Sequence, residues 1–372
     1  MHRLPARHLG AHRLRLPALV LALVALLALS ACARREEPAA PSAGAGASAA
    51  GTPAAELRLG YFPNITHAPA LIGVANGYFQ QELGTTKLTT QTFNAGPEEV
   101  SALLGGSLDA GFIGSSPAIN AFAKSNGQAV RLIAGSTSGG AQLVVSPDIT
   151  SADQLKGKVI ATPQAGNTQD VALKKWLKDN NLTNGTGPDA VTVQNIENPR
   201  TLDLFKQGQV AGGWLPEPWS SRLVDAGAKV LVDEKTLWPG GQFPTTVLIV
   251  RTQFLAEHPQ TVEALLRAEQ KSIDFATTDQ AQAKTVTNDA IKQITNSALA
   301  PAVLDRAFTE LSFGIDPLAA TFPQLSKDSV TAGATEKETN LAGFVDVAPL
   351  NNVLTAAGKP TVDAAGLDKA QG

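Results

Sequence analysis

The chain has 372 residues, of which 43% are hydrophobic and 17% charged, and its formal net charge is −3 at pH 7. This composition is that of a folded protein, and the small acidic excess argues against nucleic acid as a partner. A single cysteine, Cys32, excludes an intramolecular disulfide. Three of the five histidines lie within residues 1–12, and His67 and His258 are far apart in sequence, so we expect no His/Cys metal cluster and no cofactor.

The first 31 residues predict a signal peptide. Four arginines lie within residues 1–15, and residues 18–29 form an uninterrupted apolar run. This run is too short to span a membrane and has the length of a signal-peptide core. It ends in LSAC at residues 29–32, which resembles the lipobox of bacterial lipoproteins and implies lipidation of Cys32. A plain secretory peptide with an incidental cysteine is the alternative.

The segment after the signal peptide predicts a flexible tether. Residues 32–55 are mostly Ala, Gly, Pro and Ser and contain almost no large apolar side chain. The folded body then begins near residue 56 and is longer than one hydrophobic core usually extends. We therefore predict two lobes, with residues 56–141 and 246–372 in the first and residues 142–245 in the second.

Residues 108–120 (LDAGFIGSSPAIN) contain the pattern around which the body is organised. The short apolar run to Ile113 predicts a buried strand, and Pro117 favours the first turn of a helix. Ser116 is then the expected N-cap, with Ser115 beside it. Such a corner offers free backbone N–H groups and the positive end of a helix dipole, which suits an anion.

A second stretch, residues 207–219 (QGQVAGGWLPEPW), repeats this pattern about one hundred residues later. Aligned on their glycines, the two copies place Trp214 on Phe112 and Glu217 on Ser115. Each follows a helical run and precedes another helix, so we predict two similar α/β lobes that face each other. Chance similarity between two strand–turn–helix units is the alternative.

Four strand–helix corners, two from each lobe, and the expected crossing between lobes predict one shared ligand site. In open α/β sheets ligands bind outside the carboxyl ends of the strands. The shared chemistry is hydroxyls, amides and helix N–H groups, which suits a small oxyanion held by neutral donors. No base is seen beside a nucleophile, so we predict binding without catalysis. The candidate ligand-binding residues are Asn64, Thr66, His67, Ser115, Ser116, Ser138, Gly139, Gly140, Gly166, Asn167, Thr168, Gln169, Trp214 and Glu217.

Several candidates also have a purely structural interpretation. Ser115 and Ser116 can serve only as helix caps. Trp214 can fill the core, although its place near a strand end favours the cleft, where it would wall the organic part of a ligand together with Phe62. Glu217 would repel an anion unless it holds a ligand amine, bonds a helix N–H or points away.

The motifs at residues 60–73 (GYFPNITHAPALIG), 108–117, 161–170 (ATPQAGNTQD) and 214–219 (WLPEPW) resemble the solute-binding subunits of ABC importers for aliphatic sulfonates, taurine and nitrate. The resemblance covers nearly all of residues 56–354. It implies an α/β, two-lobed periplasmic-binding-protein fold of type II, with two crossing strands and a helical C-terminal region packed on the first lobe. Where the family often has serine and histidine, this chain has Asn167, Thr168 and Gln169.

The resemblance implies an extracytoplasmic receptor that closes by a hinge on a small anionic solute, most of all an aliphatic sulfonate. It implies a monomer anchored through the lipid on Cys32 to the outer face of the cytoplasmic membrane, or a periplasmic protein, which delivers solute to a membrane permease. Nitrate, taurine and a thiamine-pyrimidine precursor are the alternative ligands. A pyrimidine-synthase-like enzyme of the same fold is disfavoured because the chain lacks the cysteines that such an enzyme needs.

Overall fold

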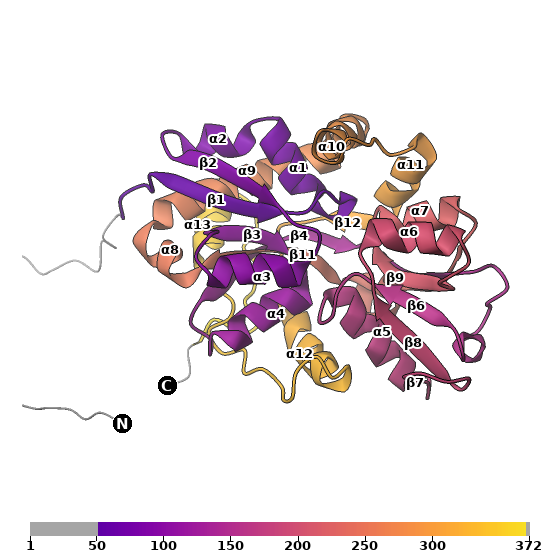
Figure 1. Cartoon of the computed structure of the whole chain (residues 1–372). Helices are drawn as coiled ribbons and strands as arrows, with labels where there is room; N and C mark the ends of the chain where they lie inside the picture. The colour runs from indigo at the N-terminus through magenta and orange to yellow at the C-terminus, as the bar shows by residue number, and fades with distance from the viewer. Residues whose placement is uncertain (1–50, 370–372) are drawn as a thin grey trace, which may run out of the picture. The chain divides into compact units, whose positions relative to one another are not determined.

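The computed structural model describes residues 51–369, which form two six-stranded sheets with helices on their faces (Figure 1). The predicted signal peptide, Cys32 and most of the predicted tether lie outside the described residues. Residues 52–55 are not a free tether, because they are bonded to the folded body. Ala54 N–H donates to Thr261 Oγ1 at 2.9 Å, and Ala54 O accepts from Thr86 Oγ1 at 2.6 Å.

The first sheet has the strand order β12-β4-β11-β3-β1-β2. Strand β1 is parallel to both β2 and β3, whereas β11 runs antiparallel to β3 and β4. Strands β3 and β11 and most of β4 are buried and apolar, as expected for central strands covered on both faces. The strands are β1 (Glu56–Tyr61), β2 (Lys87–Thr92), β3 (Ala110–Ile113), β4 (Val130–Gly139), β11 (Pro244–Arg251) and β12 (Leu311–Phe313).

The second sheet has the order β10-β5-β9-β6-β8-β7 and repeats the arrangement of the first. Strand β9 is parallel to β6 and antiparallel to β5, just as β3 is parallel to β1 and antiparallel to β11. The two similar sequence stretches therefore occupy equivalent places in the two sheets. The strands are β5 (Ala141–Val145), β6 (Val159–Thr162), β7 (Thr183–Asn184), β8 (Ala190–Asn195), β9 (Gly212–Pro216) and β10 (Lys229–Asp233).

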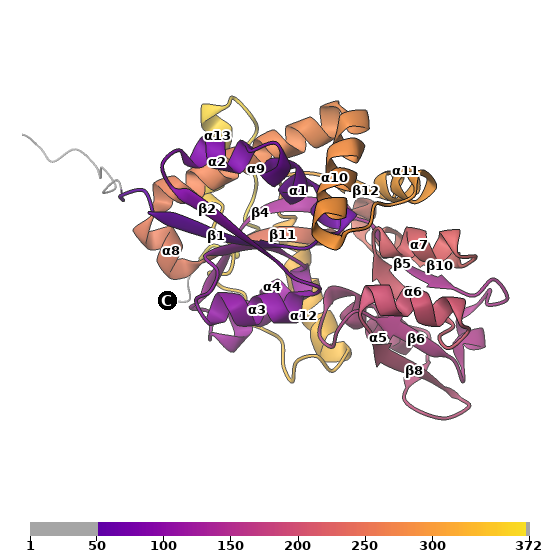
Figure 2. The same cartoon turned by 45° about the horizontal axis from the view of Figure 1, so that its top comes forward.

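Helices cover both faces of the first sheet (Figure 2): α1, α2 and α9 lie on one face, and α3 and α4 on the other. On the second sheet, α5 packs on the face that holds Trp214, and α7 on the face that holds Leu215. The helices are α1 (Ala68–Ala75), α2 (Tyr78–Leu83), α3 (Gly96–Leu104), α4 (Ser115–Lys124), α5 (Thr168–Asp179), α6 (Asn198–Lys206), α7 (Trp219–Asp225), α8 (Thr252–Glu257), α9 (Pro259–Thr278), α10 (Gln280–Thr295), α11 (Pro301–Thr309), α12 (Phe322–Thr331) and α13 (Ala348–Ala356).

We call each sheet with its helices a lobe, and the chain passes between the lobes twice. It first crosses between β4 and β5, where Gly139 and Gly140 have φ values of 74° and 73°. A side chain at either position would be strained in this left-handed conformation, so glycine permits the sharp change of sheet. The chain returns from β10 to β11 through residues 234–243, which form two short 3₁₀ turns.

The C-terminal helices mostly complete the first lobe. Helix α9 packs on α1, α2 and α13, and α10 packs on α1. Two of them also reach the second lobe, since α11 packs against α7 and α12 against α5, as Figure 1 shows for α12. The C-terminal region therefore contributes to the contact between the lobes as well as to the core of the first.

Candidate ligand-binding site

A small polar cavity of about 20 Å³ lies between the two lobes, at the ends of strands from both sheets. The second sheet contributes residues that follow β6 and β8 and the last residue of β9, and the first contributes residues that follow β1, β2 and β3 together with the start of β11. Its lining residues are Phe62, Asn64, Thr66, His67, Asn94, Gly114, Asn167, Thr168, Gln169, Asn198, Pro216, Thr245 and Thr246.

Four helices of the described chain begin at this cavity. Its lining includes the N-cap residues of α1, α4 and α5, which are His67, Gly114 and Asn167, and the first residue of α6, Asn198. A helix N-terminus carries roughly half a positive elementary charge and usually presents free N–H groups, although at α1 Ala68 N–H is bonded to Ile65 O and Pro69 has no N–H. No Lys, Arg, Asp or Glu side chain lines the cavity. The site is therefore electropositive without a formal positive charge, which suits an anion.

His67 is held in its neutral form. Its ring is buried, and burial lowers the pKa of its imidazole to about 3. Phe62 N–H donates to Nδ1 at 3.4 Å, so the ring proton is on Nε2. The ring also lies 4.3 Å from the Phe62 ring, measured between centroids, which fixes its position. His67 can thus donate one hydrogen bond to a ligand but carries no charge at neutral pH.

The first turns of α4 and α5 meet across the cleft. Ser116 N–H donates to Thr168 Oγ1 at 3.4 Å, and Asn120 Nδ2 donates to Gly166 O at 3.3 Å. The hydroxyls of Ser115 and Ser116 are fully buried, yet neither has a hydrogen-bond partner within residues 51–369. Because buried hydroxyls in folded proteins are normally paired, these two are candidate ligand contacts.

The sequence predicted Ser116 as the N-cap of α4, but neither Ser116 nor Ser115 has that role. Helix α4 begins at Ser115, Gly114 is its N-cap, and neither serine hydroxyl bonds the helix backbone. At α5 the N-cap is Asn167, but its side chain makes no cap bond. Its Nδ2 donates instead to Gln169 Oε1 at 2.9 Å. The polar side chains at both corners are therefore not used in capping these helices. Asn167 lines the polar cavity and Ser116 lines a larger neighbouring cavity, whereas Ser115 lines neither.

Several lining residues were not among the sequence candidates. Asn94 and Asn198 stand at strand–helix corners of the predicted kind, and that pattern could have identified them. Thr245 and Thr246 lie on the crossing strand β11. Threonine is common in strands of all kinds, so these residues give no indication of a ligand site in the sequence. Trp219 holds Asn64 in place by donating from Nε1 to Asn64 Oδ1 at 3.0 Å across the cleft.

Glu217 does not line the cavity, and of the roles that the sequence left open for it the structure shows a bond to a helix N–H. Its buried carboxylate accepts from Arg306 Nη1 at 2.9 Å and from Ser221 N–H at 3.2 Å, at the start of α7. Burial raises the pKa of Glu217, and the hydroxyls of Ser220 and Ser221 and the charge of Arg306 oppose that rise. Arg306 belongs to α11 and also donates to Gln142 Oε1 at 2.6 Å, so it ties the C-terminal region to the second lobe.

Trp214 lies in the core of the second lobe and does not line the polar cavity, which matches its structural interpretation. It is the third residue of β9 and not a residue beyond its end, and alternation along the strand points it at Leu143 and Leu173. Its indole is fully buried and donates to Glu234 Oε2 at 2.9 Å. Phe62, its predicted partner in walling the ligand, does line the polar cavity.

Four further candidates support the site from outside its lining. Ser138 Oγ accepts from Phe243 N–H at 3.1 Å, and the Gly139 carbonyl accepts from the Thr245 hydroxyl, which fixes the start of β11. Gly140 O accepts from Glu217 N–H at 2.8 Å. Gly166 N–H donates to Asp170 Oδ2 at 2.9 Å, which fixes the turn before α5. These residues shape the corners and the crossing strands without lining the cavity.

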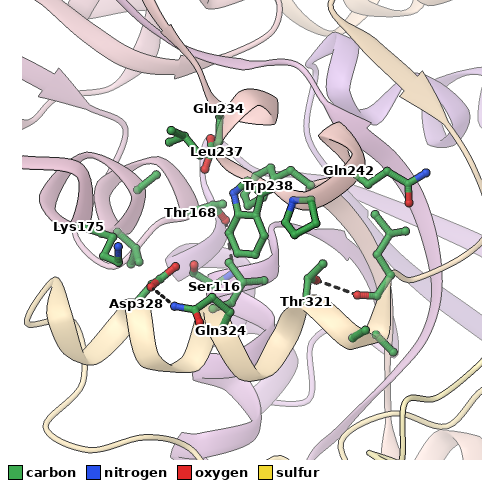
Figure 3. Close-up of a pocket in the computed structure, with 18 of the residues that line it drawn as sticks. Ser116, Thr168, Lys175, Glu234, Leu237, Trp238, Gln242, Thr321, Gln324 and Asp328 are labelled. Carbon is green, nitrogen blue, oxygen red and sulfur yellow. Dashed lines mark hydrogen bonds between the residues drawn. The ribbon is translucent and has the colours of Figure 1, made fainter. Parts of the chain in front are cut away.

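Two larger cavities adjoin the polar one. A cavity of about 240 Å³ shares Asn64, Asn94 and Asn198 with it and contains Arg222, whose guanidinium lies 4.5 Å from the Trp219 ring centroid. A cavity of about 730 Å³ shares Thr168 with it and lies between α5, α12 and the return crossing (Figure 3). The cleft therefore continues on both sides of the polar cavity.

Residues 51–369 lack two features, a cluster of metal ligands and a membrane-spanning helix. No cluster of three or more His, Cys, Asp or Glu side chains in that range is arranged to hold a metal ion. None of the helices described there is long and apolar enough to cross a membrane.

Comparison with known proteins identifies the family. The model of the NMT1-like family matches residues 50–289, which is more than half of the chain. The chain belongs to the NMT1-like family. This NMT1-like chain is 30% identical over 203 residues to the taurine-binding periplasmic protein of Escherichia coli (strain K12), a match that covers 54% of this chain and 60% of that protein. It is 27% identical over 239 residues to a putative aliphatic sulfonates-binding protein of Bacillus subtilis (strain 168), covering 59% and 64% of the two chains. These matches span less than two thirds of both relatives.

Solved structures share the fold of this NMT1-like chain. The alkanesulfonate-binding protein SsuA from Xanthomonas axonopodis pv. citri, bound to MOPS, matches with a TM-score of 0.61 and 22% identity over 76% of this chain and 93% of that one. The periplasmic nitrate-binding protein NrtA from Synechocystis PCC 6803 matches with a TM-score of 0.67 and 15% identity over 82% and 90%. The two-lobed periplasmic-binding-protein fold expected from the sequence is thereby confirmed.

Proposed function

We propose that this chain is the extracytoplasmic substrate-binding subunit of an ABC importer and that it binds a small organic anion, above all an aliphatic sulfonate, between its two lobes. The names of the relatives support this class of ligand, since they include a taurine-binding and a putative aliphatic sulfonates-binding protein. The fold supports the binding role, because it matches solved solute-binding proteins over three quarters of the chain or more.

The observation that carries the proposal is the convergence of four helix N-termini on a cavity without formal charge. A sulfonate carries one negative charge spread over three oxygen atoms, each of which accepts hydrogen bonds. The neutral His67 ring, the unpaired hydroxyls of Ser115 and Ser116 and the amide of Asn167 are donors matched to such a group. Helix dipoles then stabilise the charge in a site shielded from water.

Binding requires the lobes to move apart and close again. A cavity of about 20 Å³ holds roughly one water molecule, so a sulfonate does not fit between the lobes as they stand. Two of the direct contacts across the cleft are long, with Ser116 N–H to Thr168 Oγ1 and Thr66 N–H to Glu217 O each at 3.4 Å. A ligand that accepts hydrogen bonds from both lobes replaces these weak contacts and shifts the population toward a state closed around it.

The remaining parts of the chain fit this role. The signal sequence and the LSAC motif ending at Cys32 support export and lipid anchoring, with the folded body held at the cell envelope as a monomer. The membrane permease would then recognise the closed form. In the polar cavity Nδ1 of His67 already accepts from Phe62 N–H, and its pKa of about 3 makes the ring a weak base, which supports a binding role for this side chain.

Isothermal titration calorimetry with propanesulfonate, taurine, nitrate and a methylated aminopyrimidine tests the proposal. We expect the two sulfonates to bind more tightly than the pyrimidine. The double variant Ser115→Ala with Asn167→Ala should weaken propanesulfonate binding by roughly tenfold to a hundredfold, since each substitution removes a donor to a charged ligand. A control pair, Ser107→Ala with Asn352→Ala, changes exposed residues and should keep the affinity. The proposal is wrong if neither sulfonate binds or if the site variant binds as well as the control.

A further inference from the structure

The cavity of about 730 Å³ beside the polar site is large enough for a drug-sized organic group. Its walls are the exposed side of α5, the return crossing of residues 234–243, and α12 with the loop that precedes it (Figure 3). It thus lies between the lobes, like the polar cavity, and both are bounded by Thr168. An aliphatic sulfonate as small as taurine would leave most of this volume unfilled.

The two cavities meet at the facing first turns of α4 and α5. Ser116 lines the large cavity, Thr168 lines both, and Ser116 N–H donates to Thr168 Oγ1 at 3.4 Å. The Ser116 hydroxyl is fully buried and has no partner within the described residues. When a ligand replaces that contact, its anionic group lies at the helix N-termini and its organic part can extend into the large cavity.

Aromatic and apolar side chains form one part of the large cavity. Trp238 stands in its centre and packs on Phe243, with ring centroids 5.3 Å apart, and Trp176 of α5 also lines it. Leu237 is half exposed there, which is unusual for a large apolar side chain. These residues offer indole faces to a flat or cationic group.

The charges around the large cavity are mostly negative. Asp179, Asp316, Asp328 and Asp363 line it, against a single cation, Lys175. Lys175 is already paired with Asp179 one turn along α5. Among the described residues the other three aspartates have no ion pair, and their hydrogen bonds come from a neighbouring backbone N–H or from the Gln324 amide.

Two buried carboxyl groups at this cavity behave differently from exposed ones. Burial raises the pKa of Glu234 to about 8, although Trp214 donates to it, so Glu234 is mostly protonated at neutral pH. Burial also raises the pKa of Asp328, and Gln324 and the charge of Lys175 oppose that rise. A cation placed beside Asp328 would favour its charged form and be attracted to it, because this carboxyl group is mostly buried.

The cavity on the opposite side of the polar site has the other sign. It contains Arg222, which has no acidic partner within residues 51–369 and stacks on Trp219. The electrostatics along the cleft are therefore polarised, with a cation at one mouth, helix N-termini in the middle and acidic side chains in the large cavity. A ligand with separated charges has one favourable orientation in this field.

We propose, on the basis of the function proposed above, that the large cavity binds the organic part of the ligand and selects sulfonates that carry a positively charged aromatic group. The sulfonate is held at the N-termini of α4 and α5, the aromatic ring packs on Trp238, and the cation faces Asp328. The substrate class is accordingly a zwitterionic aromatic sulfonate, larger than the short alkanesulfonates.

Three probes separate head-group binding from recognition of the organic part. Propanesulfonate carries the head alone, phenylpropanesulfonate adds a neutral ring, and benzyldimethylammonio-propanesulfonate adds a ring and a permanent cation. Calorimetry of the purified chain at neutral pH should show affinity rising along this series, with about a tenfold gain from ring and cation together over propanesulfonate.

Variants at two positions test which side chains produce that gain. Trp238→Ala should abolish most of the difference between the zwitterion and propanesulfonate, whereas Trp238→Phe should retain part of it. Asp328→Asn should reduce the zwitterion's advantage over phenylpropanesulfonate, and the exposed Asp289→Asn should not. Ratios of affinities are compared within each variant, so a general loss of folded protein does not mimic the effect.

The outcomes distinguish this inference from the function on which it rests. If no sulfonate binds, the proposed function is overturned and this inference with it. If propanesulfonate binds but the zwitterion binds no more tightly, the function stands and the inference is overturned. It is also overturned if the zwitterion's advantage survives in both Trp238→Ala and Asp328→Asn.

Discussion

Glu269 provides a test of how burial controls charge in the first lobe. It lies on α9, is fully buried, and neither carboxyl oxygen has a hydrogen-bond partner within the described residues. Burial raises the pKa of Glu269 to about 8, against an ordinary value of 4.5, and the nearby Ser136 hydroxyl only partly opposes this. At neutral pH the folded chain therefore keeps this proton, whereas the unfolded chain has lost it.

The size of the effect follows from the two pKa values. Below pH 4.5 the carboxyl is protonated in both states, so it causes no pH-dependent loss of stability. Above that, each pH unit costs the folded state up to about 1.4 kcal/mol, reaching about 3 kcal/mol at pH 7 and levelling off near 5 kcal/mol above pH 8. These values are upper bounds, since any relaxation of the folded state around an ionised carboxylate reduces them.

Glu269→Gln removes the titrating group at almost constant volume. Urea unfolding should show that the variant becomes more stable relative to the unmodified chain as pH rises from 4 to 8, so the difference in their free energies of unfolding increases. Any fixed cost of burying the amide is the same at every pH, so the slope is the diagnostic quantity. Glu338→Gln, at an exposed position, is the matched control and should give no such slope. A stability difference for Glu269→Gln that is constant over this range would refute the reasoning.

Three further predictions concern other buried polar groups. Arg306→Ala leaves the Glu217 carboxylate buried without its ion-pair partner and should destabilise the chain by about 3 kcal/mol in urea unfolding; a loss below 1 kcal/mol would contradict the pairing. Because burial lowers the pKa of His67 to about 3, its ring is neutral from pH 5 to 8, and the affinity for propanesulfonate measured by calorimetry should vary less than twofold over that range. A steep increase in affinity as the pH falls through 6 would show a protonated ring instead. Trp214→Ala should cost about 3–5 kcal/mol of stability, because it removes a core indole and its bond to Glu234, and an unfolding midpoint close to that of the unmodified chain would show that the indole is dispensable.

Local sequence patterns predicted the fold well. The run to Ile113, the polar turn and Pro117 indicated a strand followed by a helix, and the structure has β3 and α4 there. The repeated pattern indicated equivalent strands in two lobes, and β9 takes the place in its sheet that β3 takes in the other. These signals are short-range, because turn residues and strand periodicity depend on neighbours along the chain.

The candidate site was less predictable because it depends on partners far apart in sequence. The orientation of Glu217 is set by Arg306, which is 89 positions later and has no local feature that marks it. Trp214 was placed at a strand end, but the strand continues to Pro216, so alternation buries it in the core. Thr245 reaches the site only because the return crossing brings β11 between β3 and β4.

A crystal structure of the chain with propanesulfonate would test the central claim most directly. We expect the sulfonate oxygens to accept hydrogen bonds from Ser115, Ser116 and the N-terminal N–H groups of α4 and α5, with both lobes contacting the same molecule. A sulfonate bound instead to the Arg222 guanidinium, or to one lobe alone with these serines still unpaired, would contradict it.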